Sequence, residues 1–320
     1  MLNEAYIIAC LKHEFPKQIG DDAAIIPLSA TQRYVVTKDL LVEHVHFNLT
    51  YFDAASLAHK ALHVNLSDIA AMGATPQFVL LGLAIPPTYA EQLQQFLAAF
   101  ARCCKNAKLL LIGGDTTGSP DQLFISVTVI GTAKNTQIKY RHSACQNDLI
   151  YLVGNTGFAH LGLVALETAR KGFAAFKQCC LKPTARLKEG LWLAQFAGVH
   201  ALMDVSDGLF IDLQRLCEAS KVAAEINLDG FQATRPFKAA CEKLSLDPLN
   251  TQLTGGEDYS LLVTLDPAHA AQIAAQFEAT FGDTLTPIGL IKQGHGVTFL
   301  KNGKPQLLTL KPFSHFGELF

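Results

Sequence analysis

The chain has 320 residues, of which 49% are hydrophobic, and its 26 basic side chains nearly balance 28 acidic ones. This length exceeds what one hydrophobic core usually serves, so we expect two domains. A near-neutral charge without runs of like charge excludes the electrostatic footprint that a nucleic acid or an anionic membrane surface needs. The expected partner is therefore a small molecule.

Neither a membrane anchor nor an export signal is expected. The longest apolar stretches, such as Phe78–Ile85, are too short to cross a bilayer, and Met1–Glu4 is not the basic start of a signal peptide. The eight cysteines form neither CxxC pairs nor Cys/His zinc spacing, which favours reduced thiols in the core. The sequence therefore predicts a cytoplasmic protein with no membrane partner and no redox chemistry.

The first half alternates strands and helices. Tyr34–Thr37 is a predicted strand that leads to Asp39, and a helix is expected from the cap residue Asp53 to Gly73. Within that helix Asn65 and Asp68 are three residues apart and share one face. Further strands are expected over Phe78–Ile85, Leu109–Ile112 and Phe124–Ile130, with a helix over Ala90–Ala107.

The second half repeats the alternation after a polar stretch near Lys134–Asp148, which places the expected domains at 1–140 and 141–320. A strand is expected over Leu149–Val153, then a helix over Leu161–Thr168 and a helix that contains Trp192 and ends near Gly198. Leu209, Leu213, Leu216 and Cys217 mark the core face of another helix. The predicted fold class is mixed α/β, with the functional site in a cleft between the two halves.

Acidic residues beside glycines or small polar residues recur along the whole chain. They occur in Gly20–Asp22, at Asp39, and in Asn65–Asp68, Gly113–Thr117, Asp204–Gly208 and Gly255–Tyr259. Such turns offer backbone N–H groups to oxyanions, and carboxylates supply the oxygen ligands that magnesium prefers. For Asp21, Asp212 and Asp258 we favour Asx turns or helix capping. The pattern indicates a site for magnesium and a polyphosphate.

The usual nucleotide-binding signatures are missing. The chain contains no Gly-x-x-x-x-Gly-Lys-Ser/Thr loop, no Gly-x-Gly-x-x-Gly after a strand and no His-Arg-Asp catalytic loop. Any nucleotide binding must therefore use a different kind of fold.

Six motifs, in order along essentially the whole chain, resemble the thiamine-monophosphate kinase family. They are Ile19–Asp22, Asp39–Phe47, Asn65–Ala74, Leu111–Thr117, Asp204–Leu209 and Thr254–Tyr259. The resemblance implies a two-domain fold like that of aminoimidazole ribonucleotide synthetase, with an N-terminal mixed-sheet domain, a C-terminal α/β domain and ATP at the cleft. It also implies transfer of the γ-phosphoryl group of ATP to thiamine monophosphate with several Mg²⁺ ions, in a homodimer formed through the N-terminal half.

The family assigns roles to particular residues. Transfer is carried by metal ions and not by an acid, a base or a covalent nucleophile. The implied metal ligands are Asp22, Thr37, Asp39, Asp68, Asp115, Asp204 and Asp207. Gly113, Gly114, Asp115, Arg141 and Ser206 would contact ATP, and His46, Glu257 and Phe313 would contact thiamine monophosphate. An acceptor that is already anionic repels ATP, so several cations are needed.

Some positions depart from the family pattern. Lys38, Leu40 and His44 replace residue types that are frequent there, and an ammonium group cannot ligate a metal, so only the backbone of Lys38 could do so. Two alternatives therefore stay open: another ATP-dependent synthetase of the same superfamily, and a non-catalytic descendant that binds a nucleotide or thiamine.

Overall fold

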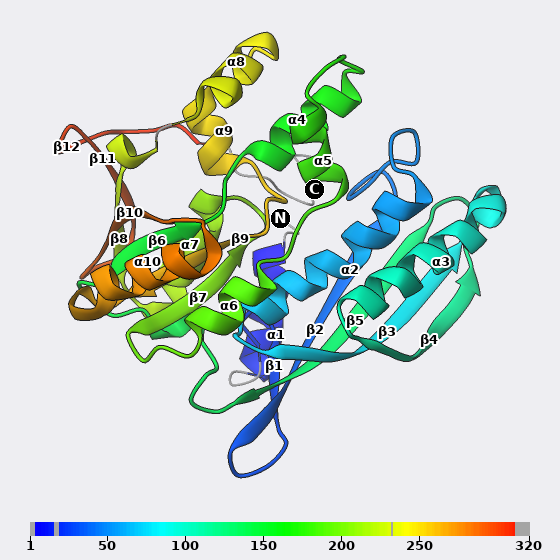
Figure 1. The fold of residues 1–320 in the computed structure, drawn as a ribbon, viewed down its shortest axis with the longest axis horizontal. Coiled ribbons are helices and arrows are strands. Elements are labelled where there is room, and N and C mark those ends of the chain that lie inside the picture. Colours follow the sequence, from blue (N-terminus) through cyan, green and yellow to red (C-terminus); the bar gives the residue numbers. More distant parts are fainter. Residues whose placement is uncertain (1–3, 16–18, 232, 311–320) are drawn as a thin grey trace.

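The computed structural model describes residues 4–15, 19–231 and 233–310, which form two mixed sheets flanked by helices (Figure 1). The first sheet has the strand order β1-β2-β5-β3-β4. Its strands are β1 (Ala24–Pro27), β2 (Gln32–Val42), β3 (Thr75–Ile85), β4 (Leu110–Gly118) and β5 (Phe124–Lys134). β3 and β4 are parallel, and the other neighbours are antiparallel.

Helices α2 (Ala54–Ala71) and α3 (Ala90–Asn106) cover one face of this sheet, and α1 (Glu4–Glu14) precedes it (Figure 1). Alternation along β5 turns Ile125, Val127 and Val129, all 0% exposed, toward the helices. The predicted mixed α/β class is confirmed, because apolar residues with the strand period and the helix period meet in one core.

The second sheet has the order β12-β11-β8-β10-β6-β9-β7. Its strands are β6 (Leu149–Val153), β7 (Val199–Val205), β8 (Ala223–Asn227), β9 (Ser260–Leu265), β10 (Leu285–Lys292), β11 (Gly296–Lys301) and β12 (Lys304–Pro305). The helices of this half are α4 (Phe158–Glu167), α5 (Ala174–Leu181), α6 (Leu187–Leu193), α7 (Leu209–Ser220), α8 (Arg235–Lys243), α9 (Pro248–Thr254) and α10 (Pro267–Phe281). Short 3₁₀ turns are η1 (Pro87–Tyr89), η2 (Arg141–Ser143) and η3 (Leu228–Gly230).

Helix α2 packs against both halves of the molecule. It begins where predicted, because the side chain of Asp53 accepts a hydrogen bond from Ser56 N at 2.6 Å and caps the helix. Ala70 and Ala71, at its C-terminal end, belong to the core of the second sheet. There α6 approaches so closely that a Cβ on Gly190 would lie 2.3 Å from the carbonyl oxygen of Ala70. Only glycine permits this approach.

Several predicted boundaries were wrong. The strand expected over Tyr34–Thr37 continues to Val42, so Asp39 lies within β2 and not after its end. The helix that contains Trp192 ends at Leu193, well before Gly198. Strand β4 was predicted to stop at Ile112 but runs to Gly118, since Gly113 and Gly114 pair with β3 instead of turning. A Cβ on Gly114 would lie 1.7 Å from the carbonyl oxygen of Leu81, so the close pairing itself requires glycine.

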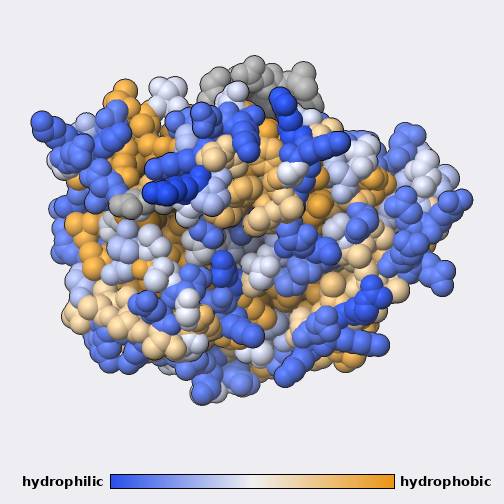
Figure 2. Space-filling model, turned by 45° about the horizontal axis from the view of Figure 1, so that its top comes forward, coloured by the Kyte–Doolittle hydropathy of each residue, from blue (hydrophilic) through white to orange (hydrophobic). Residues whose placement is uncertain are grey.

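The surface is mixed in character. Figure 2 shows hydrophilic and apolar residues interspersed over one face of the molecule. Among the described residues, no helix is both long and apolar enough to cross a membrane. This finding agrees with the short apolar stretches in the sequence.

A histidine pair on α2 makes the stability of the fold depend on pH. The rings of His59 and His63 stack with centroids 3.9 Å apart, and His63 Nδ1 accepts a hydrogen bond from Ala185 N at 3.3 Å. Burial, and then the neighbouring His59, lower the pKa of His63 to about 3. The unfolded chain therefore binds more protons than the folded one between about pH 6.5 and pH 3. This contribution to stability is present above pH 6.5 and is lost as the pH falls.

We expect His63→Asn to flatten this dependence, because asparagine does not titrate. Below pH 6.5 the free energy of unfolding of the wild type should fall relative to that of the variant by about 1.4 kcal/mol per pH unit. Urea unfolding at pH 7.5, 6 and 5 measures the difference, and His295→Asn, at an exposed position, is the control. Parallel pH profiles for the wild type and His63→Asn would contradict the assignment.

Candidate active site

A cavity of about 1160 Å³ opens between the two halves. Its walls come from the loop that precedes β1, from β2, α2 and η2, from the turn after β7 and from the segment between α9 and β9. The predicted site residues among its lining are Asp22, Thr37, Asp39, His46, Asp68, Arg141, Asp204, Ser206, Asp207 and Glu257. Residues far apart in the sequence thus meet at one junction.

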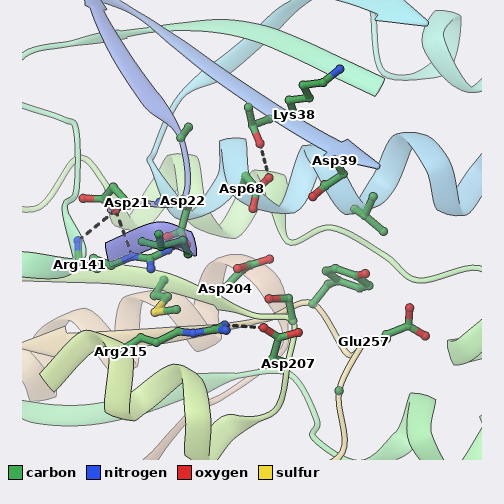
Figure 3. A pocket seen from close by; sticks show the side chains of 18 of the residues that line it. Asp21, Asp22, Lys38, Asp39, Asp68, Arg141, Asp204, Asp207, Arg215 and Glu257 are labelled. Carbon is green, nitrogen blue, oxygen red and sulfur yellow. Dashed lines mark hydrogen bonds and ion pairs between the residues drawn. The ribbon is translucent and has the colours of Figure 1, made fainter. Parts of the chain in front are cut away.

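Three carboxylates form the centre of the site. Asp22, Asp68 and Asp204 each place an oxygen within 4.8 Å of the others (Figure 3). Alternation along β2 turns Thr37 and Asp39 toward this cluster, and the hydroxyl of Thr37 donates a hydrogen bond to Asp68. These residues come from the loop before β1, from β2, from α2 and from the end of β7.

Neighbouring side chains hold the acidic residues in place. Asn65 lies on the same face of α2 as Asp68, as predicted, and its Oδ1 accepts a hydrogen bond from Asp39 N at 3.1 Å. Ser67 Oγ donates to Asp204 Oδ2 at 2.7 Å. One turn of α2 therefore supports residues of both halves.

The buried and closely spaced carboxylates of the cluster favour the binding of a cation. Burial raises the pKa of Asp22 to about 6 although Arg141 opposes the shift, and burial together with Asp207 raises the pKa of Asp39 to about 6. Burial and neighbouring carboxylates raise the pKa values of Asp68 and Asp204 well above the usual range. Among the described residues, the buried Asp22 Oδ2 has no hydrogen-bond partner. An all-oxygen set of this kind fits a hard divalent ion such as Mg²⁺.

Two arginines border the acidic cluster. Arg141 pairs with Asp22 and, at 3.5 Å, with Asp21. Arg215 pairs with Asp207 (Figure 3). It also pairs with Asp212, at 2.9 Å. Arg215 was not predicted as a site residue from the sequence. Its position three residues after Asp212 on a helix does indicate an ion pair between the two.

A buried lysine joins the two residues expected at the thiamine monophosphate end. Lys60 is 1% exposed, its Nζ lies 2.6 Å from Glu257 Oε1 and it donates to the carbonyl oxygen of His46 at 2.7 Å. The ammonium group also lies 5.3 Å from the ring centroid of Phe52. Lys60 was missed from the sequence, yet it lies eight residues before Asp68 and so shares its helical face.

Some predicted residues are not in this cavity. Gly113, Gly114 and Asp115 lie on the edge strand β4 and are exposed. The register places Gly114 beside Leu81, Leu81 beside Val127 and Val127 beside Asp39. Three strand spacings, about 14 Å, therefore separate β4 from β2. Phe313 lies outside the described residues.

The carboxylates assigned to turns and caps have structural partners. Asp21 accepts a hydrogen bond from Asp22 N at 3.1 Å, and Asp212 accepts from Asp207 N at 3.0 Å. Asp258 accepts from Gly157 N and from Ala159 N at the start of α4.

Lys38 points away from the acidic cluster (Figure 3), and its Nζ donates to Ser126 Oγ. Its side chain therefore leaves the site to the oxygen ligands.

Comparison with known proteins defines first the class and then the family. Residues 20–133 match the AIR synthase related protein, N-terminal domain, and residues 146–301 match the AIR synthase related protein, C-terminal domain. The chain is therefore a two-domain protein of this class.

Full-length relatives narrow the assignment. The thiamine-monophosphate kinase of Buchnera aphidicola subsp. Schizaphis graminum is 34% identical over 94% of this chain and 92% of its own, and that of Bacillus subtilis is 33% identical over 93% of each. The solved structure of AaThiL complexed with AMPPCP and TMP matches with a TM-score of 0.85 and 29% identity, over 98% of this chain and 97% of that chain. The chain belongs to the thiamine-monophosphate kinase family.

We expect Lys60 and Glu257 to be energetically coupled, because removing the ammonium group leaves a partly buried carboxylate without its ion-pair partner. A double-mutant cycle with Lys60→Met and Glu257→Gln should give an interaction energy of about 1–3 kcal/mol in urea unfolding. The control cycle uses Lys292 and Glu225, a more exposed pair at 3.7 Å, for which less than about 1 kcal/mol is expected. Additive effects at Lys60 and Glu257 would contradict the coupling.

Proposed function

We propose that this protein transfers the γ-phosphoryl group of ATP to thiamine monophosphate, giving thiamine diphosphate and ADP. The observation that carries the proposal is the convergence of Asp22, Asp68 and Asp204 within 4.8 Å at the junction of the two halves. Membership of the thiamine-monophosphate kinase family, and the likeness to a structure solved with AMPPCP and TMP, support both substrates.

Neutralising charge is the main task of the site. Each pair of unit charges 4 Å apart repels by about 4 kcal/mol at an effective dielectric constant near 20. Bound Mg²⁺ ions would offset this repulsion and polarise the transferred phosphoryl group. We assign their binding to Asp22, Thr37, Asp39, Asp68, Asp204 and Asp207, whose oxygens face the cavity.

The remaining residues position the two substrates. We place ATP beside Arg141 and Ser206, because a guanidinium group and a hydroxyl hydrogen-bond phosphate oxygens. Glu257 faces the cationic thiazolium of thiamine monophosphate, and Lys60 holds this carboxylate and the His46 backbone in place. Phosphoryl transfer needs little covalent chemistry from the protein beyond this positioning.

We further propose a homodimer formed through the first sheet. β4 is an edge strand, and Leu110, Leu111 and Ile112 on it are 61%, 45% and 49% exposed. An apolar edge of this kind needs a cover, and a second copy of the chain would provide one. Pairing there would also explain why Gly113, Gly114 and Asp115 lie outside the cavity of their own chain, since they would serve the partner's nucleotide.

The domain boundary that we propose lies between residues 140 and 141. β5 of the first sheet ends at Lys134 and β6 of the second begins at Leu149. The family matches break over the same stretch, at residues 134–145. Arg141 would then be the first residue of the second domain to face the ATP site.

An assay with ATP and Mg²⁺ tests the activity. Thiamine diphosphate should form from thiamine monophosphate and not from free thiamine, and the activity should be lost when EDTA removes the metal. Binding of ATP without any product would favour a non-catalytic descendant or a related synthetase.

Asp68→Asn should lower turnover at least about 100-fold, because it removes a charged metal ligand. The metal-free variant should unfold at a temperature equal to or above that of the wild type, since the change removes buried like-charge repulsion. Glu278→Gln, at an exposed position on α10, is the control for both measurements. Turnover of Asp68→Asn at the wild-type level would remove Asp68 from the metal site.

Mixing two inactive variants tests whether Asp115 serves the partner. If it does, a heterodimer of Asp68→Asn and Asp115→Asn holds one intact site and one doubly altered site. Refolding equal amounts together should then restore about a quarter of the wild-type activity. No recovery, in a mixture shown by mass spectrometry to contain heterodimers, would place Asp115 in the site of its own chain, and an active Asp115→Asn variant would place it outside the reaction.

A further inference from the structure

A second group of metal-ligating side chains lies outside the cavity. Cys145, Asp148 and His200 each place one donor atom within 4.8 Å of the others. His200 Nδ1 lies 2.8 Å from Asp148 Oδ1 and 3.0 Å from Asp148 Oδ2. None of the three lines the cavity.

Hydrogen bonds order the turn that carries Cys145 and Asp148. Cys145 N donates to Asp148 Oδ2 at 2.8 Å, and Asp148 N donates to the carbonyl oxygen of Cys145 at 3.0 Å. Ile291 N donates to the carbonyl oxygen of Asp148 at 2.8 Å, which anchors the turn to β10. The sulfur and the carboxylate are therefore held on one short loop beside the first residues of β7.

This group is buried on one side and open to solvent on the other. Asp148 is 1% exposed, the His200 side chain is 29% exposed and Cys145 is exposed. An ion could therefore reach the group from the side on which Cys145 lies, while the carboxylate of Asp148 is held below it.

The donor atoms differ in kind from those in the cavity. The cluster of Asp22, Asp68 and Asp204 in the cavity offers only carboxylate oxygens, which suit Mg²⁺, whereas this second group offers one sulfur, one nitrogen and one carboxylate. A mixed set of this kind is typical of zinc, and three protein ligands leave a fourth position for water. Ligands around tetrahedral zinc lie roughly 3 to 4 Å apart, so a rotation of the exposed Cys145 side chain would close the site.

We propose that Cys145, Asp148 and His200 form a second cation site, which binds Zn²⁺ or a similar transition metal and is independent of the phosphoryl-transfer site. The bound ion would join the turn before β6 to the start of β7. Arg141 precedes Cys145 by four residues, and Asp204 follows His200 by four on β7. The ion would therefore hold together two of the segments that bring charged residues of the second half to the cavity.

Titration with Co²⁺, a spectroscopic substitute for zinc, tests the proposal. The protein is first stripped with a chelator and then held in excess Mg²⁺ to occupy the carboxylate cluster. The wild type should bind one Co²⁺ per chain with a thiolate-to-cobalt charge-transfer band in the near ultraviolet, and Zn²⁺ should displace it. Absence of the band in the wild type would overturn the proposal.

Cys145→Ser should lose the band and at least tenfold in Co²⁺ affinity, and Zn²⁺ should no longer raise its melting temperature. The matched control is Cys10→Ser, which changes the other exposed cysteine and should behave as the wild type. Both serine variants should keep their turnover in Mg²⁺, so failure of the kinase proposal would not alter this result. A band or a zinc-induced stabilisation that survives in Cys145→Ser would overturn the assignment.

Discussion

The burial of several carboxylates close together is the constraint on which the rest of the structure depends. Asp22, Asp68 and Asp204 each place an oxygen within 4.8 Å of the others, and their pKa values are raised first by burial and then by neighbouring carboxylates. Of these three carboxylates, Arg141 forms an ion pair only with Asp22 among the described residues. The fold therefore buries negative charge that divalent cations would neutralise. Without such cations, the repulsion between the carboxylates lowers the stability of the folded protein.

Helix α2 makes this arrangement possible because it belongs to both halves. Its capped start packs with the first sheet, its end lies in the core of the second, and its inner face carries Lys60, Asn65 and Asp68. The same helix therefore sets the distance between the Lys60–Glu257 pair and the carboxylate cluster. A site on a buried helix keeps its geometry better than one on loops.

Local signals in the sequence predicted much of this architecture. The cap at Asp53, the shared face of Asn65 and Asp68, and the strand Leu149–Val153 each depend on neighbours in the chain, and the structure confirms all three. The end of β4 was mispredicted because a pair of glycines usually indicates a turn, whereas here pairing with β3 continues through it.

Contacts between distant segments could not be predicted in the same way. The pairing of Lys60 with Glu257 depends on how α2 packs against the segment between α9 and β9. The same holds for Cys145 and His200, whose separation in the sequence shows no zinc-binding pattern until β6 and β7 enter one sheet. The family motifs supplied part of this information, because their order along the chain reflects a packing that one sequence does not reveal.

The close contact between Gly190 and Ala70 has a consequence for how the molecule unfolds. Neither sheet has a complete core without α2, and α6 lies against its end with no room for a side chain at Gly190. Separating the two halves would expose the apolar end of α2 and the carboxylate cluster together. We therefore expect the two sheets to unfold as one cooperative unit despite their separate hydrogen-bond networks.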